Sequence, residues 1–157
     1  MSYCVFCKIV KGENPAQLIW EDKDHLAFLS IHPNTLGTTV VIPKKHYSSY
    51  VLEMPDQKLF EFLMATKKVA NILDNYFDDV GRTALVLEGY GVDHAHAKLF
   101  PLHGTNTKEW KPILSGPEVN KYFDKYEGYI SSHSADRADD EKLGKLARKI
   151  IKSIKIS

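Results

Sequence analysis

Hydrophobic and polar positions alternate in short runs through the first hundred residues, and one longer run follows a helical period. Runs rich in β-branched and aromatic residues, each bounded by turn residues, predict strands at 18–22, 25–31, 38–42, 83–87 and 94–102. Between the third and fourth strands, apolar side chains recur every three or four positions from Pro55 to Phe77, which predicts a long helix. The elements together predict an α+β fold, an antiparallel sheet with one long helix against it.

The pattern changes after Gly104, where Pro112 and the pair Gly116-Pro117 interrupt the chain. Helices are expected at about 118–126 and 139–154, the second with one apolar face and lysines opposite. Such a helix can lie on a membrane, but this one has few aromatic anchors. The sequence therefore predicts a first domain at 1–104 and a helical extension at 105–157, packed on the same domain or on a dimer partner.

Composition and charge exclude several classes of function. The chain has 157 residues, 43% hydrophobic and 26% charged, which is typical of a globular domain. Its net charge of +1 provides no general attraction for nucleic acids or membrane surfaces. No apolar run approaches the roughly 18–20 residues that span a bilayer, and the first residues lack a secretory signal. We expect a cytoplasmic protein with no nucleic-acid or membrane partner, whose affinity for any anion comes from a local site.

Two histidines and a lysine alternate with small apolar residues in segment 93–101. On a strand, His94, His96 and Lys98 would share one face, spaced by roughly 6.5–7 Å, while the residues between them face the helix. Packing alone gives no reason for such a row. A pair of histidines at this spacing is also typical of exposed positions or of metal ligands, so the segment by itself leaves these interpretations open.

Imidazole chemistry supports a catalytic interpretation of the same segment. Neutral imidazole is a good nucleophile at pH 7 when an acceptor holds the proton of its other ring nitrogen. That acceptor could be a backbone carbonyl, Asp93 or Glu88. A cation at Lys98 can contact phosphate oxygens and offset charge that develops in a transition state.

The sequence resembles the histidine triad family, whose catalytic strand has three histidines separated by single apolar residues. The middle histidine of that family becomes transiently nucleotidylated, and His96 falls on its position in the run 94–100. Three more segments resemble the family in the same order, at 4–15, 26–33 and 40–46. The likeness covers roughly residues 3–104. It implies an α+β, HIT-like catalytic domain at 1–104, a nucleotide or nucleoside-phosphate substrate and a homodimer.

The resemblance also implies a hydrolase or nucleotidyl transferase that works in two steps. His96 attacks the α-phosphorus of a nucleotide, and water or another acceptor then cleaves the nucleotidyl-histidine. His94 orders the site and Lys98 stabilises the developing charge. The nucleotide-binding positions implied are Ile9, Phe28, Leu29, Ser30 and Glu88. The apolar members could equally be ordinary core, which is the favoured interpretation for Leu29.

Three positions depart from the family pattern. Lys98 stands in place of the third histidine, Ser30 in place of the Asp or Asn that usually holds the ribose hydroxyls, and Thr38 in place of another histidine. These departures leave the substrate open. They motivate an alternative function, a nucleotide-binding module without turnover. A third hypothesis is a zinc hydrolase in which His94 and His96 are catalytic ligands.

Cys4 and Cys7 supply two thiolates at a spacing common in tetrahedral zinc sites. His46 and His94 are candidates for the other two ligands, and the resemblance implies a structural zinc of this Cys₂His₂ type. The alternative is a pair of reduced, unligated cysteines. No organic cofactor is expected. His25 has no such companions and is expected at the surface.

Overall fold

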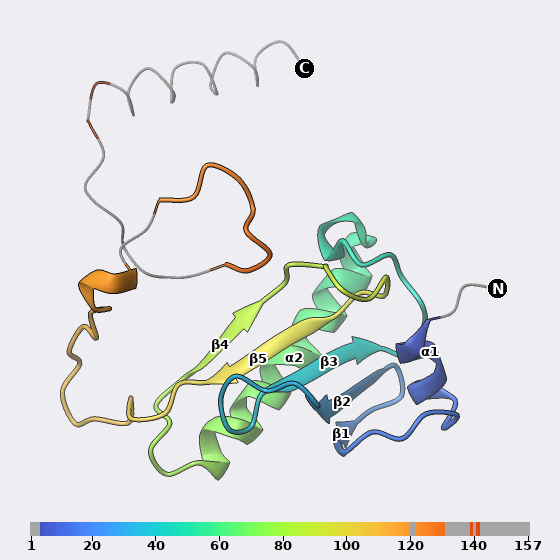
Figure 1. Ribbon diagram of the computed structural model, residues 1–157. Coiled ribbons are helices and arrows are strands. Elements are labelled where there is room, and N and C mark those ends of the chain that lie inside the picture. Colours follow the sequence, from blue (N-terminus) through green and yellow to red (C-terminus); the bar gives the residue numbers. More distant parts are fainter. Residues whose placement is uncertain (1–3, 120–121, 131–138, 140, 142–157) are drawn as a thin grey trace. The chain divides into compact units, whose positions relative to one another are not determined.

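An antiparallel sheet forms the centre of the first part of the chain. The computed structural model describes residues 4–119, 122–130, 139 and 141, and orders the strands β1-β2-β3-β5-β4 (Figure 1). Each pair of neighbouring strands is antiparallel. The strands are β1 (Leu18–Glu21), β2 (His25–Leu29), β3 (Thr39–Pro43), β4 (Thr83–Val86) and β5 (Ala97–Pro101). The predicted α+β fold is confirmed.

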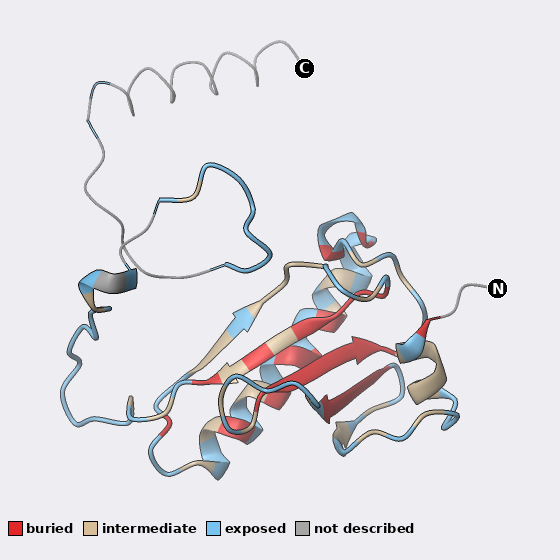
Figure 2. Ribbon diagram, viewed as in Figure 1, coloured by how far each residue is buried: buried red, intermediate tan, exposed pale blue. Residues whose placement is uncertain are grey.

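One face of the sheet is covered by the long helix α2 (Asp56–Tyr76), as the sequence predicts. Pro55 immediately precedes α2 and Phe77 caps its end, so the predicted bounds are correct to within one residue. The helix buries a single stripe, which packs against the central strands and forms the main core (Figure 2). The buried residues of α2 are Phe62, Ala65, Thr66, Val69 and Leu73.

The opposite face of the sheet carries a second apolar cluster under the short helix α1 (Val5–Val10). This cluster contains Leu26, Phe28, Val40 and Ile42, with Phe6 and Ile9 of α1 packed against it. The helix was not predicted. It begins at Cys4, whose Sγ accepts a hydrogen bond from the backbone N–H of Cys7. The cysteine pair thus also serves as the start of a helix.

The segment with the histidines enters the sheet later than predicted. β5 begins at Ala97, whereas a strand was expected from His94. The reason is a contact between distant segments: the N–H of Ala95 donates to the carbonyl of Tyr47, in the connection between β3 and α2, and not to a strand. The expected alternation nevertheless holds, because Ala95, Ala97 and Leu99 lie in the core beneath α2.

The expectation that His25 lies at the surface is wrong. Its side chain is buried, stacks on the ring of Phe62 and pairs with the carboxylate of Asp22 at 3.1 Å. Asp22 closes the turn between β1 and β2 by accepting hydrogen bonds from the N–H groups of Asp24 and His25.

The chain divides into two compact units, Met1–Glu109 and Trp110–Ser157. Residues just beyond Gly104 belong to the first unit, because the hydroxyl of Thr105 accepts from the N–H of Gly81 and the side-chain amide of Asn106 donates to the carbonyl of Asp78. The packing of the C-terminal extension stays a prediction.

The helix predicted at 118–126 is wrong where the structure describes it. A single 3-10 turn, η2 (Pro117–Val119), is present, and residues 122–126 are not helical. Tyr122 and Tyr126 are exposed, so burial of these two rings does not stabilise a helix. The helix predicted at 139–154 lies outside the described residues, apart from Asp139 and Glu141. None of the helices in the described part of the chain is long and apolar enough to cross a membrane.

Candidate functional site

The orientation of His96 is fixed by one backbone hydrogen bond. Nδ1 of its ring lies 2.7 Å from the carbonyl oxygen of His94, which can only accept. The proton of the neutral ring is therefore on Nδ1, and Nε2 carries the lone pair. Of the acceptors considered from the sequence, the structure uses the backbone carbonyl, not Asp93 or Glu88.

Nε2 of His96 reaches solvent, although only 3% of the residue is exposed. Every fully buried side-chain nitrogen or oxygen in the described residues has a hydrogen-bond partner. Nε2 has no such partner among those residues, so this atom must reach solvent. The ring is thus fixed through Nδ1, and the nitrogen that carries the lone pair has no partner among the described residues.

Burial lowers the pKa of His96 below its ordinary 6.5. The positive charge of Lys98 acts in the same direction, while the hydrogen bond to His94 and the charge of Glu88 oppose it. Burial likewise lowers the pKa of His94. Both rings are therefore neutral at pH 7, the form in which imidazole is a nucleophile or a metal ligand.

Lys98 and Glu88 form an ion pair beside His96. Lys98 lies on β5 two residues after His96, which immediately precedes that strand, and the side chain of Glu88 comes from the segment that connects β4 to β5. The Lys98 side chain is about one-third exposed and that of Glu88 is 14% exposed. The ammonium group expected to contact phosphate is thus near the histidine but is held by a carboxylate.

The side chain that organises the apolar part of the site is Phe6 of α1, which was not predicted. Its ring centroid lies 5.5 Å from the rings of both Phe28 and His96, and 5.9 Å from that of His94. Ile9 packs against the same cluster. Ile9, Phe28 and the two histidines therefore meet on one face of the sheet. A helix start at the Cys-x-x-Cys pair was the sequence signal that could have located Phe6.

Of the predicted nucleotide-binding residues, Leu29 lies on the other face of the sheet, and the role of Ser30 stays a prediction. Leu29 alternates with Phe28 on β2, so its side chain projects from the opposite face of the sheet. Leu29 is exposed, which also contradicts its interpretation as ordinary core. Ser30 follows the end of β2, and its hydroxyl accepts a hydrogen bond from the N–H of His32 within the turn.

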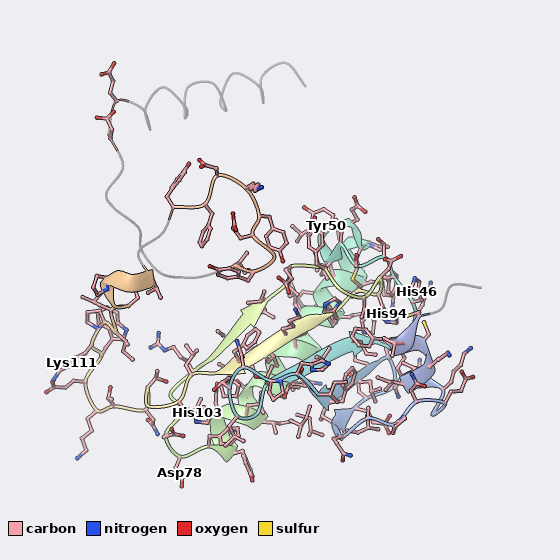
Figure 3. The ribbon with its side chains drawn as sticks, in the orientation of Figure 1. His46, Tyr50, Asp78, His94, His103 and Lys111 are labelled. Carbon is pink, nitrogen blue, oxygen red and sulfur yellow. The ribbon has the colours of Figure 1, made fainter. Side chains whose placement is uncertain are left out.

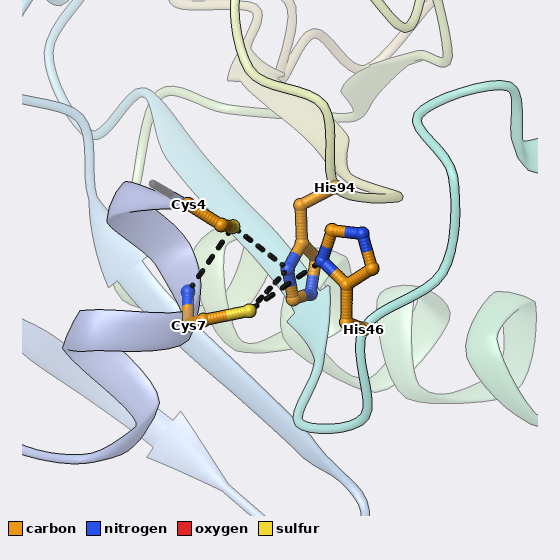
Figure 4. A group of neighbouring side chains, drawn as sticks. All are labelled: Cys4, Cys7, His46 and His94. Atoms are coloured by element: carbon orange, nitrogen blue, oxygen red, sulfur yellow. Dashed lines mark hydrogen bonds between the residues drawn. The ribbon is translucent and has the colours of Figure 1, made fainter. Parts of the chain in front are cut away.

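A cluster of four possible metal ligands joins three distant segments of the first unit. Cys4 and Cys7 come from the start of α1, His46 from the connection after β3 and His94 from the segment before β5 (Figure 4). Their ligand atoms all lie within 4.8 Å of one another. The four residues predicted from the spacing and the resemblance are therefore brought together, and the structure shows a group that can hold a metal ion.

The distances in this cluster fit zinc. Nδ1 of His94 lies 3.4 Å from Sγ of Cys4 and 3.5 Å from Sγ of Cys7, and Nδ1 of His46 lies 3.4 Å from Sγ of Cys7. Zinc bonds of about 2.3 Å to sulfur and about 2.1 Å to nitrogen place two ligands of a tetrahedron about 3.6 Å apart. Burial and the neighbouring Cys4 raise the pKa of the Cys7 thiol, so a cation is needed to keep it ionised.

The tautomer of His94 matches this function. Its Nε2 lies 2.8 Å from the carbonyl oxygen of Pro43, to which it donates, so Nδ1 has the lone pair that faces the two sulfurs. Figure 3 shows His94 beside His46, and their ring centroids are 5.0 Å apart. The third hypothesis, a zinc ion held by His94 and His96, does not match this geometry, because Nδ1 of His94 faces the two cysteine sulfurs and its Nε2 donates to a carbonyl.

A model of the HIT domain matches residues 11–104. The chain belongs to the HIT domain family. The resemblance inferred from the sequence is thereby confirmed. The HIT domain accounts for both histidines and Lys98, whereas Cys4 and Cys7 lie before the matched residues.

Several HIT relatives are similar over most of their length. An uncharacterised HIT-like protein of Methanocaldococcus jannaschii is 41% identical over 105 residues, which are 62% of this chain and 78% of the relative. The adenosine 5′-monophosphoramidase of Saccharomyces cerevisiae is 30% identical over 150 residues, 94% of this chain and 80% of the relative. A solved structure of a Streptococcus mutans protein is 30% identical, with a TM-score of 0.65 over 98% of this chain and 87% of that one.

A solved histidine triad nucleotide-binding protein of Candida albicans has the same fold. It is 25% identical, with a TM-score of 0.62, and the match covers 98% of this chain and 99% of that one.

Proposed function

We propose that this chain is a nucleotide hydrolase that breaks bonds at the α-phosphorus of adenosine 5′-monophosphate derivatives through a nucleotidyl-His96 intermediate. The orientation of His96 carries the proposal: its Nδ1–H is held by the His94 carbonyl at 2.7 Å, and its unprotonated Nε2 reaches solvent. An imidazole held in this way is ready to attack without first losing a proton.

Relatives of the chain support the choice of reaction. The proteins of Saccharomyces cerevisiae and Schizosaccharomyces pombe are named adenosine 5′-monophosphoramidases, and the second is 37% identical over 102 residues. An amidate of AMP is therefore the first substrate class to test. The apolar residues that meet beside His96, Phe6, Ile9 and Phe28, are suited to a nucleobase.

The reaction balances in two steps. Nε2 of His96 forms a bond to the α-phosphorus while the bond from phosphorus to the leaving group breaks, and the leaving amine departs after taking a proton from water. A water molecule then attacks the phosphorus and gives up a proton to solvent, which replaces the one taken by the amine. The P–N bond to His96 breaks, and AMP is released with the histidine restored. Lys98, shared with Glu88, offsets negative charge on the phosphate oxygens in both steps.

We also propose that Cys4, Cys7, His46 and His94 hold a structural zinc ion. Zinc, when bound, supplies structural cross-linking, since all four ligands are protein side chains and no position is left for a substrate. His94 then has two functions within this chain. Its ring belongs to the metal cluster, and its carbonyl holds Nδ1 of His96.

The test compares wild type with His96→Ala on an AMP amidate, with His32→Ala, an exposed histidine outside the site, as the matched control. We expect turnover to fall at least 1,000-fold in His96→Ala, as when other covalent nucleophiles are removed (on the order of 10⁴–10⁶). We expect no change in His32→Ala. Intact-mass measurement after a rapid quench should show wild type carrying one AMP group. Turnover in His96→Ala equal to that of wild type would refute the proposal.

A second candidate is a nucleotide-binding module without turnover, and one observation favours it: Lys98 is held by Glu88 and is not the neutral histidine usual in the family. Binding of AMP with no cleavage of any amidate or phosphoanhydride would establish this second function. Turnover that depends on His96 would exclude it.

A further inference from the structure

A hollow of about 430 Å³ is lined in part by Glu88, the partner of Lys98, and the mechanism above does not use it. Its walls are the connection between β3 and α2, which contributes Ser49 and Tyr50, and the loop between β4 and β5, residues 88–93. Figure 3 shows Tyr50 at the same end of the unit as His46 and His94. The volume is within the range of small-molecule sites.

Two close contacts hold the walls of the hollow together. The carboxylate of Asp93 accepts a hydrogen bond of 3.0 Å from the N–H of Ser49. Gly89 has a φ of +73°, and a Cβ at that position would lie 2.8 Å from the carbonyl oxygen of Ser49. The loop can approach Ser49 this closely because residue 89 is glycine. The hollow is therefore formed before any ligand arrives.

The lining of the hollow is acidic and aromatic. Glu88 and Asp93 contribute two carboxylates, and Tyr50 and Tyr90, which are 51% and 66% exposed, contribute two rings. No lysine or arginine is among the described residues that line it. Even with the charge of Glu88 offset by Lys98, Asp93 leaves the hollow negative. The carboxylates attract cations by charge, and the faces of the tyrosine rings attract them by cation–π interaction. The same carboxylates repel phosphates.

Glu88 connects the hollow to the reaction centre, since it lines the hollow and pairs with Lys98, two residues after His96. We infer that the hollow between Tyr50 and Tyr90 binds an organic cation, the positively charged part of the substrate's leaving group. The inference rests on the proposed function for the reaction, but the binding of a cation can be measured without any turnover. An anionic polyphosphate leaving group is disfavoured by the same lining.

The binding test uses choline and its uncharged isostere 3,3-dimethylbutan-1-ol as probes of the full chain. We expect choline to bind more tightly and to shift the amide resonances of Gly89 and Gly91 in nitrogen-15 spectra. Tyr50→Ala should weaken choline about fivefold by removing a ring face, whereas Tyr50→Phe, which keeps the ring, should not. Asp93→Asn keeps the acceptor for Ser49 and should weaken choline about fourfold, the effect of one charge about 5 Å away in water. Equal affinities for the two probes, or variants that change neither, would overturn the cation site.

The turnover test uses two AMP amidates whose leaving amines end in a trimethylammonium group or in the isosteric tert-butyl group. Tyr50→Ala and Asp93→Asn should lower kcat/KM for the cationic substrate by the same factors and leave the neutral one unchanged. Equal losses on both substrates would overturn the assignment to the leaving group. If wild type cleaves neither amidate, the proposed hydrolase fails, and the choline measurements still decide whether the cation site exists.

Discussion

Zinc should raise the thermal stability of the domain through the cluster of Cys4, Cys7, His46 and His94. Its ligands come from segments up to 90 residues apart, so only the folded chain brings them together. Binding to the folded state alone stabilises it by about 4 kcal/mol when free zinc is about 1,000 times its dissociation constant. In a domain of about 100 residues, 1 kcal/mol raises Tm by about 4 °C. The expected increase on loading zinc is therefore about 16 °C.

The assay is thermal unfolding followed by circular dichroism, on chelator-treated protein with and without added zinc. Cys7→Ser and His46→Ala test the cluster, because neither residue is fully buried and each substitution removes one ligand at little other cost. We expect both variants to lose most of the zinc-induced increase in Tm. His32→Ala should keep it. A wild-type Tm that does not move with zinc, or variants that respond as wild type does, would refute the reasoning.

Two further predictions concern groups outside the metal cluster. The carbonyl of Leu36 and the carboxylate of Asp79 raise the pKa of His103 above its ordinary 6.5. Protonated His103 therefore stabilises the fold fully below pH 6.5, and this stabilisation is lost as the pH rises through the raised pKa of the folded state. A proton NMR titration should give a raised pKa for His103 in wild type and a lower one in Asp79→Asn. The same pKa in both proteins would contradict the ion pair. Gly89 and Gly91 both have positive φ, so an alanine at either position costs about 1–2 kcal/mol of backbone strain. Gly89→Ala should destabilise the fold more than Gly91→Ala, because only a Cβ at residue 89 meets the carbonyl of Ser49. Equal losses of unfolding free energy in urea would show that the close approach is unimportant.

The sheet and α2 could be predicted because their patterns are long or strongly alternating. Ala95, Ala97 and Leu99 are apolar at every second position, and this alternation alone places them under the helix. The 21 residues of α2 give several turns of apolar spacing. In such segments, local propensity and tertiary burial agree, so a single sequence is sufficient.

The parts that were missed depend on contacts between distant residues. α1 has six residues, too few for a helical pattern, and it is held by contacts with β2 and with the histidine segment. The start of β5 is set by the carbonyl of Tyr47, which accepts the hydrogen bond from Ala95, and no sequence pattern reveals that pairing. His25 is buried because its ring stacks on that of the distant Phe62, a contact that its neighbours in sequence, Asp22 among them, do not indicate.

The position of Phe6 makes the proposed activity depend on the docking of the short helix α1. A six-residue helix does not persist in water by itself, so α1 stays docked through its cysteines and through the contacts of Phe6 with Phe28 and His96. Detachment of α1 would remove Phe6 from the proposed nucleobase site and from the ring of His96 without unfolding the sheet, although the carbonyl of His94 would still hold Nδ1 of that ring. Proteolytic cleavage near Phe6 should therefore abolish the proposed turnover, while the far-ultraviolet circular dichroism spectrum stays almost unchanged.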